Sequence, residues 1–375
     1  MMFNRRSRSA RRGVSILEVL FAIAVTTIGL LGAIAVFPVA SAQARKGRIS
    51  DAMAVAGMSA AHDFDVRGMR KPTNWVAFDF GTGAAVSPVT QYENYLAAEA
   101  STPGSGNPQH RWFSGHMAVC IDPRYIANHM DFSTSPPRLK VQGAAAQAAR
   151  FPGGEASGIP RISLLGGTST ALRAAVAEAI FMFDDDLTFG RPDDLSLNAY
   201  QVMDRIGTTD FKRQSDGHMS WMATLVPKLG ADSVVVDEYI LSVVVFYDRP
   251  LDELTDTAQK STTELTFNIG SGTATAFPGG GITGGDVRLR GGETELNRIK
   301  SNDWLLLAAT SNGKPVMRWY RVVDVDADAV VSGSEFERHV TLFGQDWDTS
   351  LNTNAVWVEG VVGVYEKTIR LDRTL

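Results

Sequence analysis

Hydrophobic and polar positions divide this chain into a long apolar N-terminal segment and a mixed remainder. Residues 14–39 are nearly all apolar or small, and Glu18 is the one formal charge between Val14 and Ala44. A helix of this length, at about 1.5 Å per residue, exceeds the roughly 30 Å that a bilayer core requires. Alanine and methionine continue to about residue 61. The pattern predicts one long helix over 14–62, whose outer half packs on the following domain.

Three residues in this segment predict irregularities in the helix. Pro38 has no backbone donor, so it should kink the helix or loosen its hydrogen-bond ladder. Gly47 and Gly57 weaken the expectation of continuity, because glycine costs about 1 kcal/mol relative to alanine inside a helix.

From about residue 64 the chain becomes aromatic, β-branched and glycine-rich. Residues Thr170–Phe183 predict a helix, because apolar positions recur on one face. Segments 219–226 and 238–247 predict strands, and the turn residues Gly230–Asp232 between them suggest an antiparallel pair. Further strands are expected at 262–269, 303–309, 316–325, 338–343 and 355–369.

We therefore expect an α+β protein, with a long N-terminal transmembrane and amphipathic helix followed by a large, mainly antiparallel β head. The glycine-rich stretch 270–285 predicts a loop between two β subdomains. The expected divisions are a leader at 1–13, a transmembrane helix at 14–40, an exported continuation of that helix at 41–63, an α+β head at 64–269 and a β-rich C-terminal subdomain at 270–375.

Charge is mild overall but uneven along the chain. The net charge of −5 gives no electrostatic reason to expect nucleic acid as a partner. The first 13 residues hold five arginines and no acid, which predicts a cytoplasmic N-terminus and a head on the other side of the membrane. Arg45, Lys46 and Arg48 oppose this orientation, but the N-terminal cluster is larger and comes first.

Two ordinary interpretations of the apolar segment are a plain transmembrane anchor and a cleavable secretory signal. Ala40-Ser41-Ala42 has the A-x-A form of a signal cleavage site, which would leave Gln43 as the first residue. However, the apolar region of a signal is usually about 7–15 residues long. This segment is far longer and contains an acid.

The arginine-rich leader that ends at Gly13, the apolar helix directly after it, and Glu18 at the fifth position past the glycine resemble the N-terminus of type IV pilins and type II secretion pseudopilins. The resemblance implies that a prepilin peptidase cuts after Gly13 and methylates Val14, and that Glu18 serves in assembly. The family most often has Phe or Met where this chain has Val14. The resemblance also implies an inner-membrane protein with a periplasmic head that then enters a pilus or pseudopilus.

The proposed roles of these residues also have a physical basis. Cleavage would leave the amine of Val14 about 6 Å along the helix from Glu18. A carboxylate in a low dielectric is stabilised by a nearby cation, so Glu18 of an incoming chain could pair with the amine of a chain already in place. The acid would then set the axial register of subunits. The alternative is a carboxylate that snorkels to the membrane surface and only fixes topology.

One candidate for metal binding stands in the C-terminal part. Asp324, Asp326, Asp328 and Glu335 match positions 1, 3, 5 and 12 of an EF-hand calcium loop. The sixth position is Ala329 instead of glycine, and both flanks predict strands. The sequence therefore favours a solvated hairpin loop over a calcium site.

No pattern in the chain predicts catalysis or a cofactor. The six histidines form no H-E-x-x-H pair, and no G-x-S-x-G elbow is present. The single cysteine, Cys120, lies in an apolar run and is expected to be a buried, inert thiol.

The sequence therefore predicts a non-enzymatic structural subunit of a filament. Its expected partners are other pilin or pseudopilin subunits, a prepilin peptidase and inner-membrane lipid, and the large head could contact a secreted cargo. The head's size favours a minor subunit. The alternative from another class is a single-pass anchored exported binding module that does not polymerise.

Overall fold

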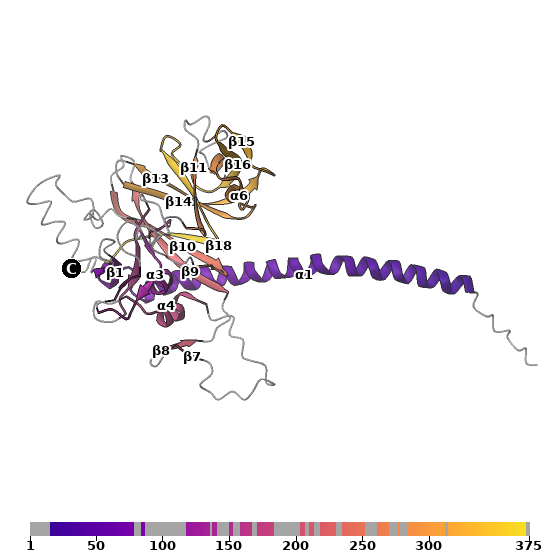
Figure 1. Ribbon diagram of the computed structural model, residues 1–375, viewed down its shortest axis with the longest axis horizontal. Coiled ribbons are helices and arrows are strands. Elements are labelled where there is room, and N and C mark those ends of the chain that lie inside the picture. Colours follow the sequence, from indigo (N-terminus) through magenta and orange to yellow (C-terminus); the bar gives the residue numbers. More distant parts are fainter. Residues whose placement is uncertain are drawn as a thin grey trace, which may run out of the picture. The chain divides into compact units, whose positions relative to one another are not determined.

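The computed structural model describes most of the helix and the sheets of this chain (Figure 1). The described residues are 16–78, 84–86, 118–135, 137–140, 150–152, 158–166, 171–183, 203–206, 210–213, 218–229, 235–251, 261–269, 277, 284–311 and 314–372. The chain forms two compact units, Met1–Ala52 and Met53–Leu375.

The N-terminal helix α1 spans Ile16–Val66 without interruption. It continues through Pro38, Gly47 and Gly57, and it ends four residues beyond the expected end at 62. The hydroxyl of Ser41 donates to the carbonyl oxygen of Pro38 at 2.8 Å, in the turn that follows the proline. The expectation of one long helix is confirmed for the described residues.

The last part of α1, from Met53 onward, packs on strand β18 (Val361–Ile369). Two glycines permit this close approach, one on each side. A Cβ at Gly57 would lie 2.0 Å from the Tyr365 ring, and a Cβ at Gly363 would lie 2.5 Å from the sulfur of Met53. The Tyr365 hydroxyl donates to the carbonyl oxygen of Met53 at 3.1 Å. The expected packing of the outer half of the helix on the head is confirmed only from Met53 onward.

The first sheet contains seven strands in the order β18-β10-β9-β3-β6-β1-β2. All neighbours are antiparallel except β3 and β6, which are parallel. The expected pair is confirmed, because β9 and β10 run antiparallel from Leu229↔Val235 to Met219↔Tyr247. Besides β18, the strands are β1 Trp75–Phe78, β2 Ala85–Val86, β3 Val119–Ile121, β6 Arg161–Leu164, β9 Met219–Leu229 and β10 Val235–Tyr247.

The second sheet closes into an antiparallel barrel. Its order is β12-β11-β17-β13-β14-β16-β15, and an additional pairing of β12 with β16 joins the two sides and leaves β15 (Val330–Ser332) outside the closed ring. The sequence did not predict this closure. The ring strands are β11 Glu264–Ile269, β12 Gly284–Gly291, β13 Trp304–Ser311, β14 Lys314–Val325, β16 Glu335–Phe343 and β17 Thr353–Val358.

The barrel uses both faces of its strands, which explains its runs of consecutive apolar residues. Leu305 and Leu307 of β13 point into the barrel core with Phe267, whereas Leu306 between them packs toward the first sheet. Such alternation follows from the two-residue period of a strand. Trp319, on the outer face of β14, lies in the same cluster as Leu306 and donates to the Thr224 hydroxyl at 3.4 Å. The barrel and the first sheet therefore share an apolar interface.

Short elements complete the described head. They are η1 Pro72–Asn74, α3 Pro123–Asn128, α4 Ala174–Phe181, α6 Glu293–Leu296, β4 Met130–Asp131, β5 Arg138–Leu139, β7 Met203–Ile206 and β8 Asp210–Arg213. The helix expected over Thr170–Phe183 is thus shorter, and Thr170 lies outside the described residues, as do the turn residues 230–232 and nearly all of the expected loop over 270–285.

One expected strand is wrong, because the segment 355–369 forms two strands. β17 belongs to the barrel and β18 to the first sheet. Gly360 between them has φ +83, and a Cβ there would lie 2.9 Å from the carbonyl oxygen of Tyr247. The chain therefore turns at a position that only glycine occupies without strain. The sheets are also distributed differently from the expected subdomains 64–269 and 270–375, since β11 and β12 on either side of 270 pair with each other.

Candidate functional site

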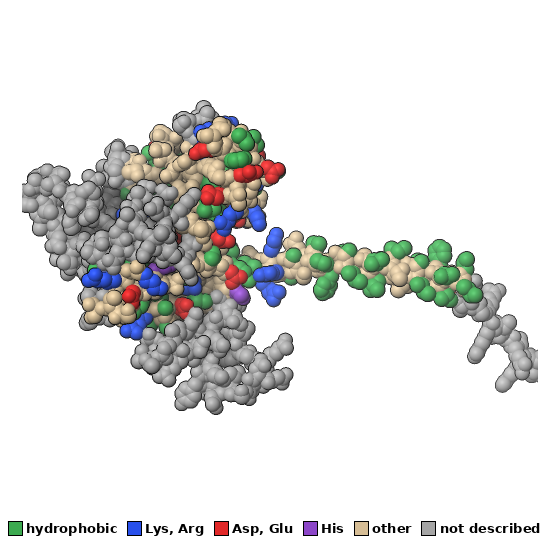
Figure 2. Space-filling model, viewed as in Figure 1, with side chains coloured by type: hydrophobic (Ala, Val, Ile, Leu, Met, Phe, Trp, Pro, Cys, Tyr) green, Lys and Arg blue, Asp and Glu red, His purple; other side chains and the backbone are tan. Residues whose placement is uncertain are grey.

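The apolar part of α1 is exposed along its whole described length. Ile16 is 81% exposed and Phe37 is 76% exposed. Figure 2 shows hydrophobic side chains following one another along this helix. Fully burying one such side chain is worth about 1.5–3 kcal/mol, so the exposed surface calls for an apolar environment. This is the one helix among the described residues that is long and apolar enough to cross a membrane.

Glu18 is the acidic residue in the first turn of α1, and its side chain is exposed. A carboxylate near a helix N-terminus is favoured by the helix dipole. Among the residues that the structure describes, no cation forms an ion pair with it within this chain. Gly13 and Val14, the expected processing residues, lie outside the described residues.

The helix has two different apolar faces. Because successive residues turn by about 100°, the residues within about 40° of Glu18 around the helix are small or β-branched, and Phe21 lies at the border of this face. They are Ala22, Val25, Gly29, Gly32, Val36 and Ala40. The opposite face carries the bulky side chains, namely Ile16, Leu20, Ile23, Leu31 and Ile34.

The glycines on the Glu18 face have open space beside them among the described residues. A Cβ built at Gly29 or at Gly32 would have no atom within 4 Å. Small residues on a transmembrane helix let a second helix approach closely. The Glu18 face therefore combines a carboxylate with room for another backbone.

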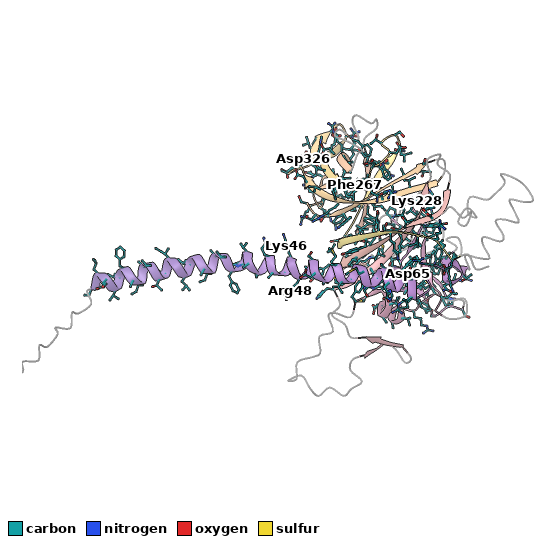
Figure 3. The ribbon with its side chains drawn as sticks, turned by 180° about the vertical axis from the view of Figure 1, so that it is seen from behind. Lys46, Arg48, Asp65, Lys228, Phe267 and Asp326 are labelled. Atoms are coloured by element: carbon teal, nitrogen blue, oxygen red, sulfur yellow. The ribbon has the colours of Figure 1, made fainter. Side chains whose placement is uncertain are left out.

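Basic residues follow the apolar part of the helix. Arg45, Lys46 and Arg48 are exposed, and Figure 3 shows Lys46 and Arg48 on the helix. Long basic side chains at this place can reach the polar surface of a membrane. They mark the end of the segment that is apolar enough to be buried in lipid.

The structure does not bring the four calcium candidates together. Asp324 belongs to β14, Asp326 and Asp328 to the connection that follows, and Glu335 begins β16. Among the described residues, no group of three or more His, Cys, Asp or Glu side chains could hold a metal ion. The EF-hand spacing here arises from a hairpin connection between strands.

A side chain already occupies the carbonyl oxygens of that connection. The guanidinium of Arg338, which is 6% exposed, donates to the carbonyl oxygens of Asp326 at 2.9 Å and Ala327 at 3.1 Å. It also donates to the carbonyl oxygens of Leu296 and Ile299. A fixed organic cation thus satisfies backbone oxygens of the kind that a calcium ion would bind.

The head contains a buried ion network that no sequence pattern predicted. Arg161 on β6 forms ion pairs with Asp122 and with Glu264, and all three are nearly inaccessible. Arg249 donates to both carboxylate oxygens of Asp122, at 2.9 and 2.6 Å. The Arg161 guanidinium also lies 3.8 Å from the centre of the Tyr125 ring. The network joins the first sheet to β11 of the barrel.

Charges within the network hold the Asp122 carboxylate ionised. Burial raises the pKa of Asp122, but the positive charges of Arg249 and Arg161 outweigh burial and lower it to about 2. The adjacent Cys120 is fully buried, and burial raises the pKa of its thiol. The prediction that Cys120 is a buried thiol is confirmed. We assign this network to stability, since every charge is matched by another.

Comparisons of this chain with protein-family models, with curated proteins and with solved structures found no match. The function of the protein is therefore inferred from its residues and their geometry.

Proposed function

We propose that this protein is a structural subunit of a filament, a pilin or pseudopilin that is cut after Gly13 and assembled through its N-terminal helix. The proposal combines the resemblance of the leader, Gly13 and Glu18 to prepilins with the properties of α1. Residues 14–40 would anchor the chain in the inner membrane, with the N-terminus cytoplasmic and the head periplasmic.

The observation that carries the proposal is the position of Glu18 on the small-residue face of an exposed apolar helix. An ionised side chain near the bilayer centre costs roughly 2.5–3.5 kcal/mol on insertion scales. The amine of Val14 on a neighbouring subunit would offset this cost at one axial stagger. Gly29 and Gly32 on the same face would let the neighbouring helix come close enough.

The end of α1, from Met53 onward, belongs to the same compact unit as the head. Ala56, Gly57, Ala60 and Phe64 of this part of the helix are buried. The Lys367 ammonium lies 3.2 Å from a carboxylate oxygen of Asp65. A subunit drawn out of the membrane by its helix would need such a firm attachment.

Replacement of Glu18 tests this proposal. Glu18→Ala should leave membrane insertion intact, because the apolar length is unchanged, and should reduce the amount of the protein in sheared filaments. Thr27→Ala is the matched control. Thr27 lies on the opposite face, and its hydroxyl donates only to carbonyl oxygens of its own helix, those of Ile23 and Ala24. Equal incorporation of both variants would contradict the proposed role of Glu18 and favour an anchored binding module.

A further inference from the structure

Strand β15 has one open edge at the outer end of the barrel. It pairs with β16 through Val330↔Glu337, Val331↔Phe336 and Ser332↔Glu335, and it has no second neighbour among the described strands. The turn that joins the two strands begins with Gly333 at φ +68. Glycine at this position suits the two-residue turn of type II′.

The geometry of this hairpin sets the direction of the backbone at Val331. Hydrogen-bonded and non-hydrogen-bonded pairs alternate along an antiparallel ladder, and the pair that flanks a two-residue turn is hydrogen-bonded. Ser332 and Val330 therefore direct their amides toward β16, whereas Val331 directs its amide and carbonyl away from it. One donor and one acceptor of the main chain are thus presented at the edge.

The side chains on this edge are apolar. Val330 is 66% exposed and Val331 is 67% exposed. Proteins usually protect edge strands with charges, proline or bulges. The edge strand β18 of the first sheet is protected by charges, since Glu366 and Lys367 are exposed on it. The edge of β15 carries valines instead.

The connection that precedes β15 is held in place by hydrogen bonds. Arg338 donates to the carbonyl oxygens of Asp326 and Ala327, as described above. The amide of Ala329 donates to the side-chain oxygen of Asn297 at 3.3 Å. Figure 3 shows Asp326 at one end of the barrel. Because the edge is already ordered, a partner would lose little free energy in fixing it.

The chain segment that forms this edge is acidic, although Arg338 follows it directly and Arg290 lies beside Glu337. Residues 323–337 include five acids and no lysine or arginine. Glu337 is paired with Arg290 at 2.9 Å. The other four, Asp324, Asp326, Asp328 and Glu335, have exposed side chains. Such a surface attracts a basic partner and repels an acidic one.

We propose that the edge of β15 binds an extended segment of another protein in which basic and β-branched residues alternate. The segment adds a strand beside Val331 and packs its apolar side chains on the face that Val331 shares with Phe336. Its basic side chains lie on the opposite face, where Glu335 stands across from Ser332. This surface does not depend on the proposed filament assembly. It serves a pilin-like subunit and an anchored module equally.

A pair of synthetic peptides tests this proposal on the full chain in detergent micelles. One peptide alternates lysine and valine, and the other has glutamate in place of each lysine. Fluorescence anisotropy should show binding of the lysine peptide and none of the glutamate peptide. Absence of binding, or equal binding of the two peptides, overturns the proposal.

Two kinds of variant separate strand addition from general attraction between charges. Val331→Pro removes the outward amide and leaves the ladder with β16, so it should weaken binding about tenfold. If that variant does not fold, Val331→Lys replaces it, with Val323→Lys as its match. Val323 is 55% exposed at the bulge of β14, where the ladder with β16 passes from Val322 to Asp324, so it lies outside β15 and next to one of the same carboxylates.

The two lysine variants add the same charge, so strand addition predicts a greater loss of affinity for Val331→Lys. Equal losses for the two variants overturn the proposal in favour of general charge attraction. Self-association of the full chain that Val331→Pro abolishes overturns the choice of partner, because the occupant is then a second copy.

Discussion

The head and the apolar part of α1 contain similar residues in opposite situations. In the head, the ring of Tyr365 occupies the space beside Gly57, and the buried carboxylate of Asp122 is paired with two arginines. In the apolar helix, Gly29 has no atom near it, and Glu18 has no cation beside it among the described residues. At Gly57 and Asp122, contacts within the chain pack the glycine and pair the carboxylate. At Gly29 and Glu18, the described residues provide neither contact, and the proposed filament assembly would supply both from a neighbouring subunit.

The largest expected effect comes from breaking the internal pairing of the head. Arg161→Met would leave Asp122 and Glu264 buried without this partner, which should lower the free energy of unfolding by about 3–5 kcal/mol. Chemical denaturation of the full chain in detergent measures it. Arg298→Met is the control, because its pair with Glu359 is partly exposed and should contribute under about 1 kcal/mol. Equal losses of unfolding free energy in the two variants would show that the buried network stabilises the fold no more than the exposed ion pair does.

The second prediction concerns acid. Although burial raises the pKa of Asp122, the two arginines lower it to about 2 in the folded chain, below the ordinary aspartate value of 3.8. Its contribution to stability is therefore present above about pH 4 and is lost as pH falls toward 2. That contribution is about 2 kcal/mol. Unfolding free energies measured from pH 5 to pH 2 should therefore fall more steeply for the native chain than for Asp122→Asn. Parallel curves would contradict the pairing.

The third prediction compares two glycines directly. Gly57→Ala forces a Cβ into the Tyr365 ring and should cost about 1–2 kcal/mol after the better helix propensity of alanine is counted. Gly29→Ala meets nothing in the chain and should not destabilise it. Thermal unfolding measures the change in stability for both variants. A loss of stability in Gly29→Ala would show that its face is already occupied within the chain.

The smallest effect is expected where the helix is fastened to the head. Tyr365→Phe removes the hydrogen bond to the carbonyl oxygen of Met53 and keeps the ring against Gly57. The loss should be about 0.5–1 kcal/mol. Amide exchange near the end of α1 should become faster. An unchanged exchange rate would mean that ring packing alone holds the helix.

The same comparison explains which features could be predicted from the sequence. The apolar run predicted α1, and β-branched runs predicted strands such as β9 and β10, because both patterns are local in the sequence. The turn at Gly360 was missed, since apolar residues continue on both sides of it. The barrel closes through the pairing of β12 with β16, and Arg161 pairs with Glu264, which is 103 positions away in the sequence. Local patterns carry no signal for either contact. The EF-hand spacing of Asp324, Asp326, Asp328 and Glu335 was also a local pattern, but the folded chain does not bring these side chains together into a metal site.

The central claim is that a neighbour's new N-terminal amine pairs with Glu18, and it requires cleavage after Gly13. Mass spectrometry of the protein extracted from membranes tests this most directly. The account predicts a mature chain that starts at Val14, with or without one added methyl group. A chain that keeps its arginine-rich leader, or one that starts at Gln43, would contradict it.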